Sequence, residues 1–377
     1  MTEPVKASWC EIYPDRIANN LKIGLDLIPP ETGFCAVLKA DAYGHGINAV
    51  VPVVMAAGVN HIGITSNAEA RAVRDAGFAG NLLRLRSATP VEIRDALQDR
   101  VQEQVSSPEA AQIFAKLAQE GHPNPGLHLA LNADGMSRDG LELSTAEGQQ
   151  ACLRILDLVG GHIAGICTHF PSNTPEDLRH SDQRFQADVS WVIEHSRLKR
   201  TDVLVHAGSS LTLGSRQPVT TDMYRCGALL YGIINRELGF RPTIELKAHI
   251  TNVGSYPKGS TIGYDRAVTL DQPRRLANVS LGYANGFGRD SFGRGEILIR
   301  GQKVPILGKI SMNTIIADVT GLTEVQSGDE AVVFGQQGQE CIDIVRSEHQ
   351  FRTIMADLFV DWGGRSPRVY LPGTASC

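Results

Sequence analysis

The 377-residue chain has little of what several large classes of protein require. It contains no run of about 18 apolar residues, the length that a membrane-spanning helix needs. Its N-terminal stretch, MTEPVKASWCEIY, lacks the apolar core of a signal peptide. Basic residues are not in excess, since 36 Lys and Arg stand against 41 Asp and Glu. We therefore expect no membrane or nucleic-acid partner, and a cytoplasmic location, or a periplasmic one if a leader has been removed.

Cysteine is scarce and scattered. Seven cysteines stand at positions 10, 35, 152, 167, 226, 341 and 377. The number is odd and no pair shows the spacing of metal ligands, so the sequence predicts neither a disulfide framework nor a metal site. We interpret most of these thiols as buried and reduced, which agrees with a cytoplasmic protein.

Short apolar runs alternate with segments of helical apolar spacing over the first 240 residues. The runs are GFCAVLKA (33–40), HIGITS (61–66), NLLRLRS (81–87), RVQEQVSS (100–107), GLHLALN (126–132), HIAGICTHF (162–170), DVLVHAGSS (202–210) and MYRCGALLYG (223–232). Eight such alternations predict an α/β fold, a parallel (β/α)8 TIM-like barrel over residues 12–240. Chemistry in such barrels lies at the carboxyl ends of the strands. Several chemically useful residues fall there: Lys39, Arg138, His169, Ser209, Ser210 and Arg225.

The pattern changes after residue 240. Segments such as IELKAHITNVGSY alternate apolar and polar residues and break at Pro and Gly. This texture predicts a C-terminal, mostly antiparallel β domain over residues 241–377, joined by an N-terminal strand within residues 1–11. Sustained helical spacing occurs there in RTIMADLFVDWG (352–363).

The stretch AVLKADAYGHG (36–46) ends a buried strand with a lysine and a glycine-rich turn. Lysine is rarely buried without a partner. Lys39 therefore either reaches water at the strand end or has a covalent role. A lysine in this place can bond to the aldehyde of pyridoxal 5′-phosphate, a cofactor that accepts electrons from a carbanion. HAGSS (206–210) and RCGALLYG (225–232) offer small residues where backbone could approach a phosphate.

AVLKADAYGHG resembles the cofactor-lysine signature of alanine racemases and their broad-specificity relatives. Further motifs of that family follow in its order over nearly the whole chain: NADGMSRDG (132–140), THF (168–170), HAGSS, MYRCGALLYG, TIGYD (261–265), GYANGF (282–287) and GKISMNT (308–314). The resemblance implies a barrel that binds pyridoxal 5′-phosphate, followed by a β domain. It also implies an isomerase that interconverts L- and D-amino acids, and a homodimer with active sites at the interface.

The resemblance also implies roles for individual residues. Lys39 would hold the cofactor and act as one base, and Tyr264 of the partner subunit would act as the second base on the opposite face of the substrate. Arg225 would face the pyridine nitrogen; as a donor only, it cannot accept a proton from it. Other implied cofactor contacts are Tyr43, Arg138, His169, Ser209, Ser210, Gly227 and Ala228, and implied substrate contacts are Arg138, Tyr283, Met312, Asn313 and Ala356. Taken alone, Tyr264 is typical of a packing tyrosine and His169 of a strand-end histidine.

Three departures from the strict alanine racemase pattern bear on the substrate. Leu131 stands where the family has a lysine, often carbamylated, so we expect a chloride near Arg138 and Asn132 in its place. Asn313 replaces an aspartate, and Ala356 stands where a tyrosine usually lines the pocket. The sequence therefore predicts broad specificity that includes lysine and arginine as well as alanine.

Other interpretations remain open. In a strict alanine racemase, the same chemistry would operate and the three departures would be without effect on the substrate. A basic amino-acid decarboxylase on a similar barrel would need an acidic partner for the pyridine nitrogen, where this chain has Arg225. A non-catalytic carrier of the cofactor would lack the β domain. A metal-dependent lyase would need a His/Cys cluster, which the tail does not contain.

Overall fold

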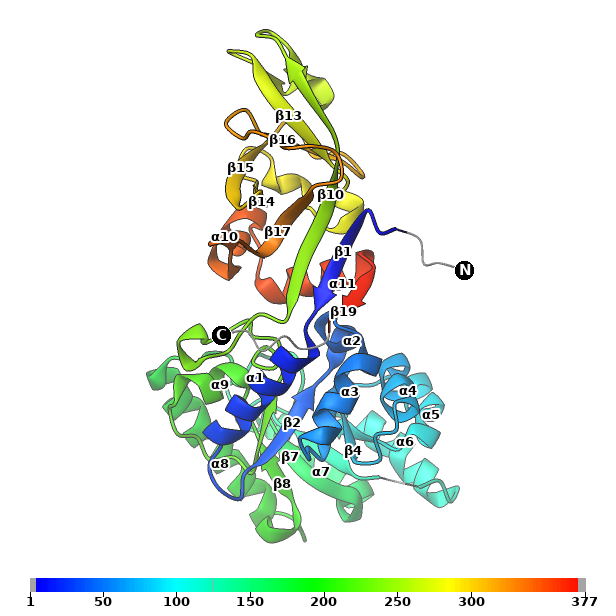
Figure 1. Ribbon diagram of the computed structural model, residues 1–377. Coiled ribbons are helices and arrows are strands. Elements are labelled where there is room, and N and C mark those ends of the chain that lie inside the picture. The colour runs from blue at the N-terminus through cyan, green and yellow to red at the C-terminus, as the bar shows by residue number, and fades with distance from the viewer. Residues whose placement is uncertain (1–4, 124, 372–377) are drawn as a thin grey trace. The chain divides into compact units, whose positions relative to one another are not determined.

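The computed structural model describes residues 5–123 and 125–371. It forms two compact units (Figure 1). One unit contains Ile17–Ala42 and Ile47–Phe240. The other contains the N-terminal segment up to Arg16, the short segment Tyr43–Gly46, and the chain from Arg241 onward. No helix among the described residues is long and apolar enough to cross a membrane.

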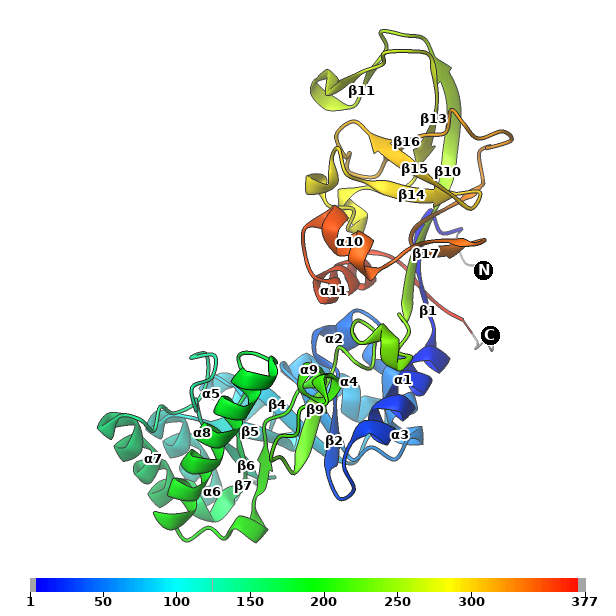
Figure 2. The same cartoon turned by 90° about the vertical axis from the view of Figure 1, so that its left-hand side faces the viewer.

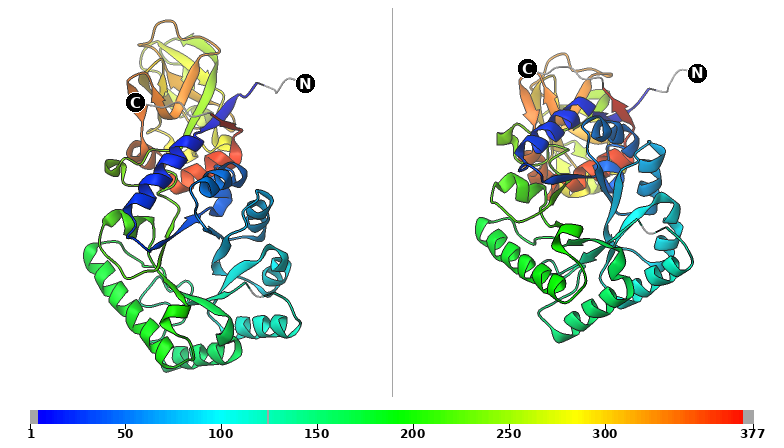
Figure 3. Two further views of the ribbon diagram at one scale, coloured as in Figure 1. Left: turned by 60° about the horizontal axis from the view of Figure 1, so that its bottom comes forward. Right: turned by 90° about the horizontal axis from the view of Figure 1, so that it is seen from below.

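The first unit is built on eight parallel strands: β2 (Gly33–Val37), β3 (His61–Ile64), β4 (Asn81–Ser87), β5 (Val101–Val105), β6 (Leu127–Ala130), β7 (Ile163–Cys167), β8 (Leu204–His206) and β9 (Met223–Cys226). They pair in the order β8-β7-β6-β5-β4-β3-β2-β9. The ends of this row meet, because Arg225 pairs with Ser209 and donates its backbone N–H to Gly208 O at 2.8 Å. The predicted barrel is confirmed, with its helices outside the strands (Figure 3).

The covering helices are α1 (Pro14–Leu27), α3 (Ile47–Ala56), α4 (Asn67–Asp75), α5 (Pro90–Asp95), α6 (Pro108–Gln119), α7 (Ala146–Val159), α8 (Pro175–Glu194) and α9 (Ser210–Ser215); α2 (Lys39–Tyr43) is a single turn. Leu127 and Leu129 of β6 point outward and pack with Phe114 and Phe185 of the helices. The alternate residues therefore point into the barrel, where His128 lies.

The second unit carries a nine-stranded sheet. Its strands are β1 (Ser8–Ile12), β10 (Ile244–Tyr256), β13 (Arg274–Val279), β14 (Glu296–Ile299), β15 (Gln302–Leu307), β16 (Ile315–Asp318), β17 (Glu330–Gln337), β18 (Glu340–Ile342) and β19 (Arg368–Tyr370). All pairs are antiparallel except β1 with β19. β11 (Thr261–Ile262) and β12 (Val268–Thr269) form a small separate pair (Figure 2). β1 pairs antiparallel with β10, so the N-terminal strand lies in this sheet.

The described residues from 241 onward contain two α-helices, whereas the sequence predicted one. α11 (Met355–Arg365) confirms the predicted helix and buries Met355, Leu358, Phe359 and Trp362. α10 (Ile344–Phe351) was missed. Its buried face has helical spacing but includes Ser347 and Gln350, so apolar periodicity could not reveal it.

The cysteines match their predicted state where the structure describes them. Cys10, Cys35, Cys152, Cys167 and Cys226 are buried and free, whereas Cys341 is free but exposed. Cys377 lies outside the described residues.

Candidate active site

The carboxyl ends of the barrel strands bring together four cationic or basic side chains. Lys39 follows β2, Arg138 lies in the loop after β6, His169 follows β7, and Arg225 is in β9. Burial and the charges of Arg225, Arg138 and Lys39 lower the pKa of His169 to about 3. His169 is therefore neutral at physiological pH, inside a cluster that is otherwise positive and suited to an anionic ligand.

Lys39 lies half-buried in this cluster. Burial lowers the pKa of its ammonium, the charge of Arg138 lowers it further, and the Glu69 carboxylate opposes both. A lowered pKa makes the neutral amine more available, which is what a lysine nucleophile or base needs. Of the two interpretations of Lys39, this environment favours the covalent one.

The residues after Lys39 form a left-handed turn, which the sequence did not reveal. Ala40, Asp41 and Ala42 have φ values of 54°, 51° and 56°. Two carboxylates hold the turn: Ala40 N–H donates to Glu69 Oε1 at 2.7 Å, and Ile47 N–H donates to Asp41 Oδ1 at 2.8 Å. Since L-residues pay about 1–2 kcal/mol each for this conformation, tertiary contacts must impose it.

This turn gives a test by substitution at the exposed Ala40. Ala40→Gly should raise the free energy of unfolding by up to about 1 kcal/mol, because glycine accepts a positive φ. Ala40→Val should lower it by about 1–2 kcal/mol. The measurement is urea unfolding, and Ala72→Gly in the right-handed helix α4 is the matched control. That control should destabilise by about 1 kcal/mol, so equal signs at both positions would contradict the left-handed turn.

Arg225 is buried and is held by neutral acceptors. Its Nη1 donates to His206 Nδ1 at 2.8 Å, and its Nη2 donates to Thr168 O at 2.8 Å and Ala207 O at 3.1 Å. His169 Nδ1 lies 3.4 Å from Nη2, as expected for a histidine that supports Arg225. None of the hydrogen bonds found for Arg225 among the described residues involves a carboxylate.

The small residues after β8 and β9 lie against each other. Ser210 Oγ accepts the backbone N–H of Gly227 at 3.0 Å and that of Leu229 at 3.3 Å. Ser209 caps α9 by accepting the N–H of Thr212. Ala228 follows Gly227 in the same turn. The hydroxyls and N–H groups expected to hold a phosphate therefore occur in one place, next to the strand that carries Arg225.

The remaining predicted residues, Tyr43, Tyr264, Tyr283, Met312, Asn313 and Ala356, belong to the other unit. There, the segments of Tyr283 and Met312 are joined: Tyr283 N–H donates to Ser311 O at 3.1 Å and Ala284 N–H to Met312 O at 3.0 Å. Asn313 follows Met312, and Ala356 lies in the first turn of α11. Tyr43 ends the left-handed turn with a φ of 53°.

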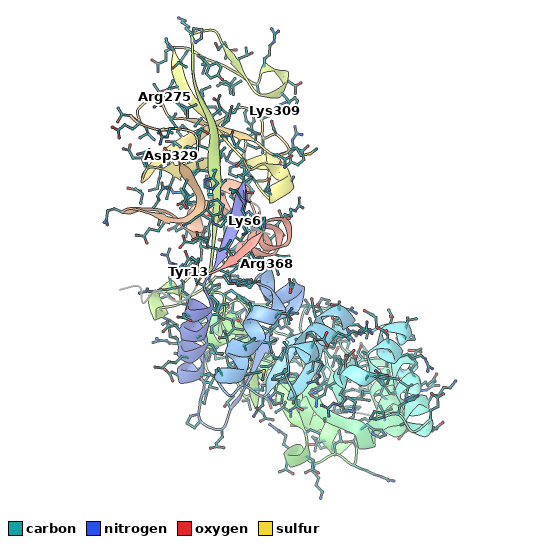
Figure 4. The ribbon with its side chains drawn as sticks, turned by 45° about the vertical axis from the view of Figure 1, so that its right-hand side comes forward. Lys6, Tyr13, Arg275, Lys309, Asp329 and Arg368 are labelled. Carbon is teal, nitrogen blue, oxygen red and sulfur yellow. The ribbon has the colours of Figure 1, made fainter. Side chains whose placement is uncertain are left out.

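Tyr264 is 63% exposed and Met312 is 55% exposed. In the loop of Tyr264, Lys309 Nζ donates to Asp265 Oδ2 at 2.6 Å; Lys309 is labelled in Figure 4. The phenol of Tyr264 therefore lies at the surface of its unit, next to this ion pair.

The chain belongs to the alanine racemase family. Residues 12–235 match the alanine racemase N-terminal domain and residues 243–370 match the C-terminal domain. It is an amino-acid racemase, in a family that depends on pyridoxal phosphate. A relative named broad specificity amino-acid racemase, from Aeromonas hydrophila subsp. hydrophila, is 40% identical over 96% of this chain and 89% of its own. A lysine racemase from Proteus mirabilis is 36% identical over 97% and 90%.

Solved structures share the fold. Alanine racemase from Streptomyces coelicolor A3(2) superposes with a TM-score of 0.88 at 25% identity, over 97% of this chain and 98% of that chain. Alanine racemase from Bartonella henselae with covalently bound pyridoxal phosphate gives 0.83 at 22% identity, over 98% and 100%. The groups gathered in the barrel, an amine of lowered pKa, a guanidinium, and serine hydroxyls beside glycine N–H groups, fit this cofactor.

Proposed function

We propose that this protein racemises several classes of amino acid with two bases, Lys39 and Tyr264 of the partner subunit, in a homodimer. The observation that carries the proposal is the place of Lys39: a half-buried amine of lowered pKa at a barrel strand end, beside Arg138, His169 and Arg225. The exposure of Tyr264 supports a role at a surface that a second copy covers.

The proposed chemistry divides among the chain's own groups. When bound, pyridoxal phosphate withdraws electrons from the substrate's α-carbon and so makes its proton labile. The Lys39 amine takes or returns that proton on one face, and the phenol of Tyr264 of the partner subunit does so on the other. Arg138 binds the substrate carboxylate. Arg225, which can only donate hydrogen bonds, would hold the ring nitrogen and could not accept a proton from it.

The remaining implied contacts belong to this proposal as well. Tyr43, Ser209, Ser210 and the N–H groups of Gly227 and Ala228 would hold the phosphate, since hydroxyl and backbone N–H groups donate hydrogen bonds to phosphate oxygens. Four further residues would contact the substrate: Tyr283, Asn313, Met312 of the partner subunit near the substrate carboxylate, and Ala356 in the pocket for its side chain.

The chloride near Arg138 stays a prediction. It was expected because Arg138 would otherwise lack an anionic partner, and the structure places a carboxylate beside this arginine. Arg138 is 56% exposed and lies 3.3 Å from a carboxylate oxygen of Asp139. Asn132 donates its amide N–H to Glu142 Oε2 at 2.7 Å. Carboxylates thus already face both residues. Racemase activity measured with chloride replaced by acetate tests the ion: a loss supports chloride, whereas unchanged activity means that Asp139 and Glu142 suffice.

The first experiment is chiral chromatography of single L-amino acids incubated with the purified protein and pyridoxal phosphate. D-lysine and D-arginine alongside D-alanine would support broad specificity, as the names of the relatives do. D-alanine alone would overturn broad specificity but keep the two-base reaction. No D-product from any substrate, with Lys39→Ala as the blank, would overturn the proposal.

Ala356 should widen the substrate pocket. Ala356→Tyr restores a phenol at this position, so kcat/KM for lysine should fall by about tenfold or more relative to that for alanine. Competition between the two substrates measures the ratio. The matched control is Val345→Tyr on the exposed side of α10, where the side chain is 74% exposed; it should leave the ratio unchanged. An unchanged ratio in Ala356→Tyr would remove Ala356 from the pocket.

A further inference from the structure

A continuous row of hydrogen bonds crosses the inside of the barrel from Arg225. Arg225 Nη1 lies 2.8 Å from His206 Nδ1, His206 Nε2 lies 2.9 Å from His128 Nδ1, and His128 Nε2 lies 3.1 Å from Gln102 Oε1. Gln102 Nε2 in turn donates to Pro125 O at 3.1 Å. The row joins β9, β8, β6 and β5 and ends away from the proposed active site.

Both ends of the row fix its direction. A guanidinium only donates, so His206 Nδ1 must accept and its Nε2 must carry the proton. That N–H then donates to His128 Nδ1, which leaves the proton of His128 on Nε2. A carbonyl only accepts, so the amide nitrogen of Gln102 faces Pro125 and its oxygen faces His128. One arrangement of protons therefore satisfies every link.

The barrel is shaped around this pair of imidazoles. His128 and His206 are 2% and 1% exposed. Gly165 on β7 lies beside them, and a Cβ there would stand 2.3 Å from His128 Nδ1. Burial, together with His61 and the charge of Arg225, lowers the pKa of His128 to about 3. Burial, Arg225, His128 and His61 hold the pKa of His206 well below its usual range. Both rings are thus neutral, as the row requires.

We propose that Gln102 and His128 are positioning residues that fix His206 as its Nε2–H tautomer, and so keep an acceptor aimed at Arg225. If His128 carried its proton on Nδ1, His206 Nε2 would have to accept that N–H, and the proton of His206 would lie on Nδ1. Two N–H groups, from His206 and Arg225, would then face each other without an acceptor. The neutral amide of Gln102 prevents this, because its oxygen accepts a hydrogen bond from His128 Nε2–H without stabilising a charge on His128. The effect on catalysis rests on the proposed function, in which Arg225 contacts the cofactor. The assignment of the tautomer does not rest on the proposed function.

The tautomer can be measured without turnover, on protein labelled with 15N in its histidine rings. The expected result is an Nε2–H tautomer for both rings between about pH 5.5 and 8, with a scalar coupling across the hydrogen bond from His206 Nε2 to His128 Nδ1. His128 is assigned as the ring that Gln102→Glu perturbs most, and His206 by that coupling. An Nδ1–H tautomer of His206 in the unmodified protein would overturn the proposal, even if every variant failed to fold.

Gln102→Glu tests the catalytic consequence. A carboxylate raises the pKa of His128, whose other charged or titratable neighbours are Arg225, His206 and His61. The ratio of kcat in the variant to kcat in the unmodified enzyme should fall as pH decreases through that new pKa and recover as pH rises, with KM little changed. Gln119→Glu, an exposed residue of α6, is the control for charge and should show no such dependence. If His128 titrates in Gln102→Glu but the kcat ratio does not depend on pH, the positioning role of Gln102 and His128 is overturned. Absence of racemisation in the unmodified enzyme would instead overturn the proposed function.

Discussion

Tyr264→Phe should lower the rate of racemisation by about a thousandfold or more. Deuterium from solvent should still exchange into one enantiomer of the substrate. With two bases on opposite faces, loss of one leaves the other able to remove and return a proton on its own side. Lys39 should therefore continue exchange on its face, and inversion should stop. Proton NMR of L- and D-alanine incubated separately in D2O measures this asymmetry.

The control for this prediction is Tyr256→Phe, a change of the same kind at a tyrosine 39% exposed on β10, which should keep full activity. Racemisation that survives in Tyr264→Phe would remove Tyr264 as a base. Loss of exchange from both enantiomers would mean that the phenol is needed to bind or align the substrate, and the assignment of one base to each face would then fail.

Arg84→Met should destabilise the barrel by about 3–5 kcal/mol, the usual result of leaving a buried charge without its partner. Arg84 donates to both carboxylate oxygens of Glu103, at 2.8 and 3.0 Å, and the two side chains are 0% and 5% exposed. It also donates to Thr65 O and Asn67 Oδ1, so it ties β4 to the start of α4. Burial raises the pKa of Glu103 even with Arg84 present.

Urea unfolding measures the effect. The double variant Arg84→Met with Glu103→Leu should recover most of the lost free energy of unfolding, because two apolar side chains leave no unpaired charge in the interior. The control is Arg71→Met, since Arg71 pairs with Asp95 at the surface with side chains 51% and 50% exposed; it should change the free energy of unfolding far less than Arg84→Met does. A loss of similar size for Arg71 and Arg84 would contradict the special role of burial.

Part of the candidate site could be predicted because its signals are local. The place of Lys39 follows from one buried run and the turn after it, and the gathering of Arg138, His169 and Arg225 follows from their position after strands of one barrel. Missed features had weaker local signals. The left-handed turn after Lys39 depends on the Glu69 carboxylate, 29 residues away from Ala40 in sequence. A Glu three residues after Ser66, a capping-box pattern, was the one visible clue.

The sequence by itself determined the strands, the barrel and the nature of the β domain, since the period of apolar residues is a property of neighbouring positions. Which buried polar side chains of the barrel unit contact each other is known only from the tertiary structure. His128 and His206 are 78 residues apart, and Arg84 and Glu103 are 19 apart. A residue's own neighbours specify whether it points inward, but its hydrogen-bond partner depends on the register of other strands. The row of hydrogen bonds from Arg225 to Gln102 and the Arg84–Glu103 ion pair therefore depend on the closed barrel, which brings distant strands together.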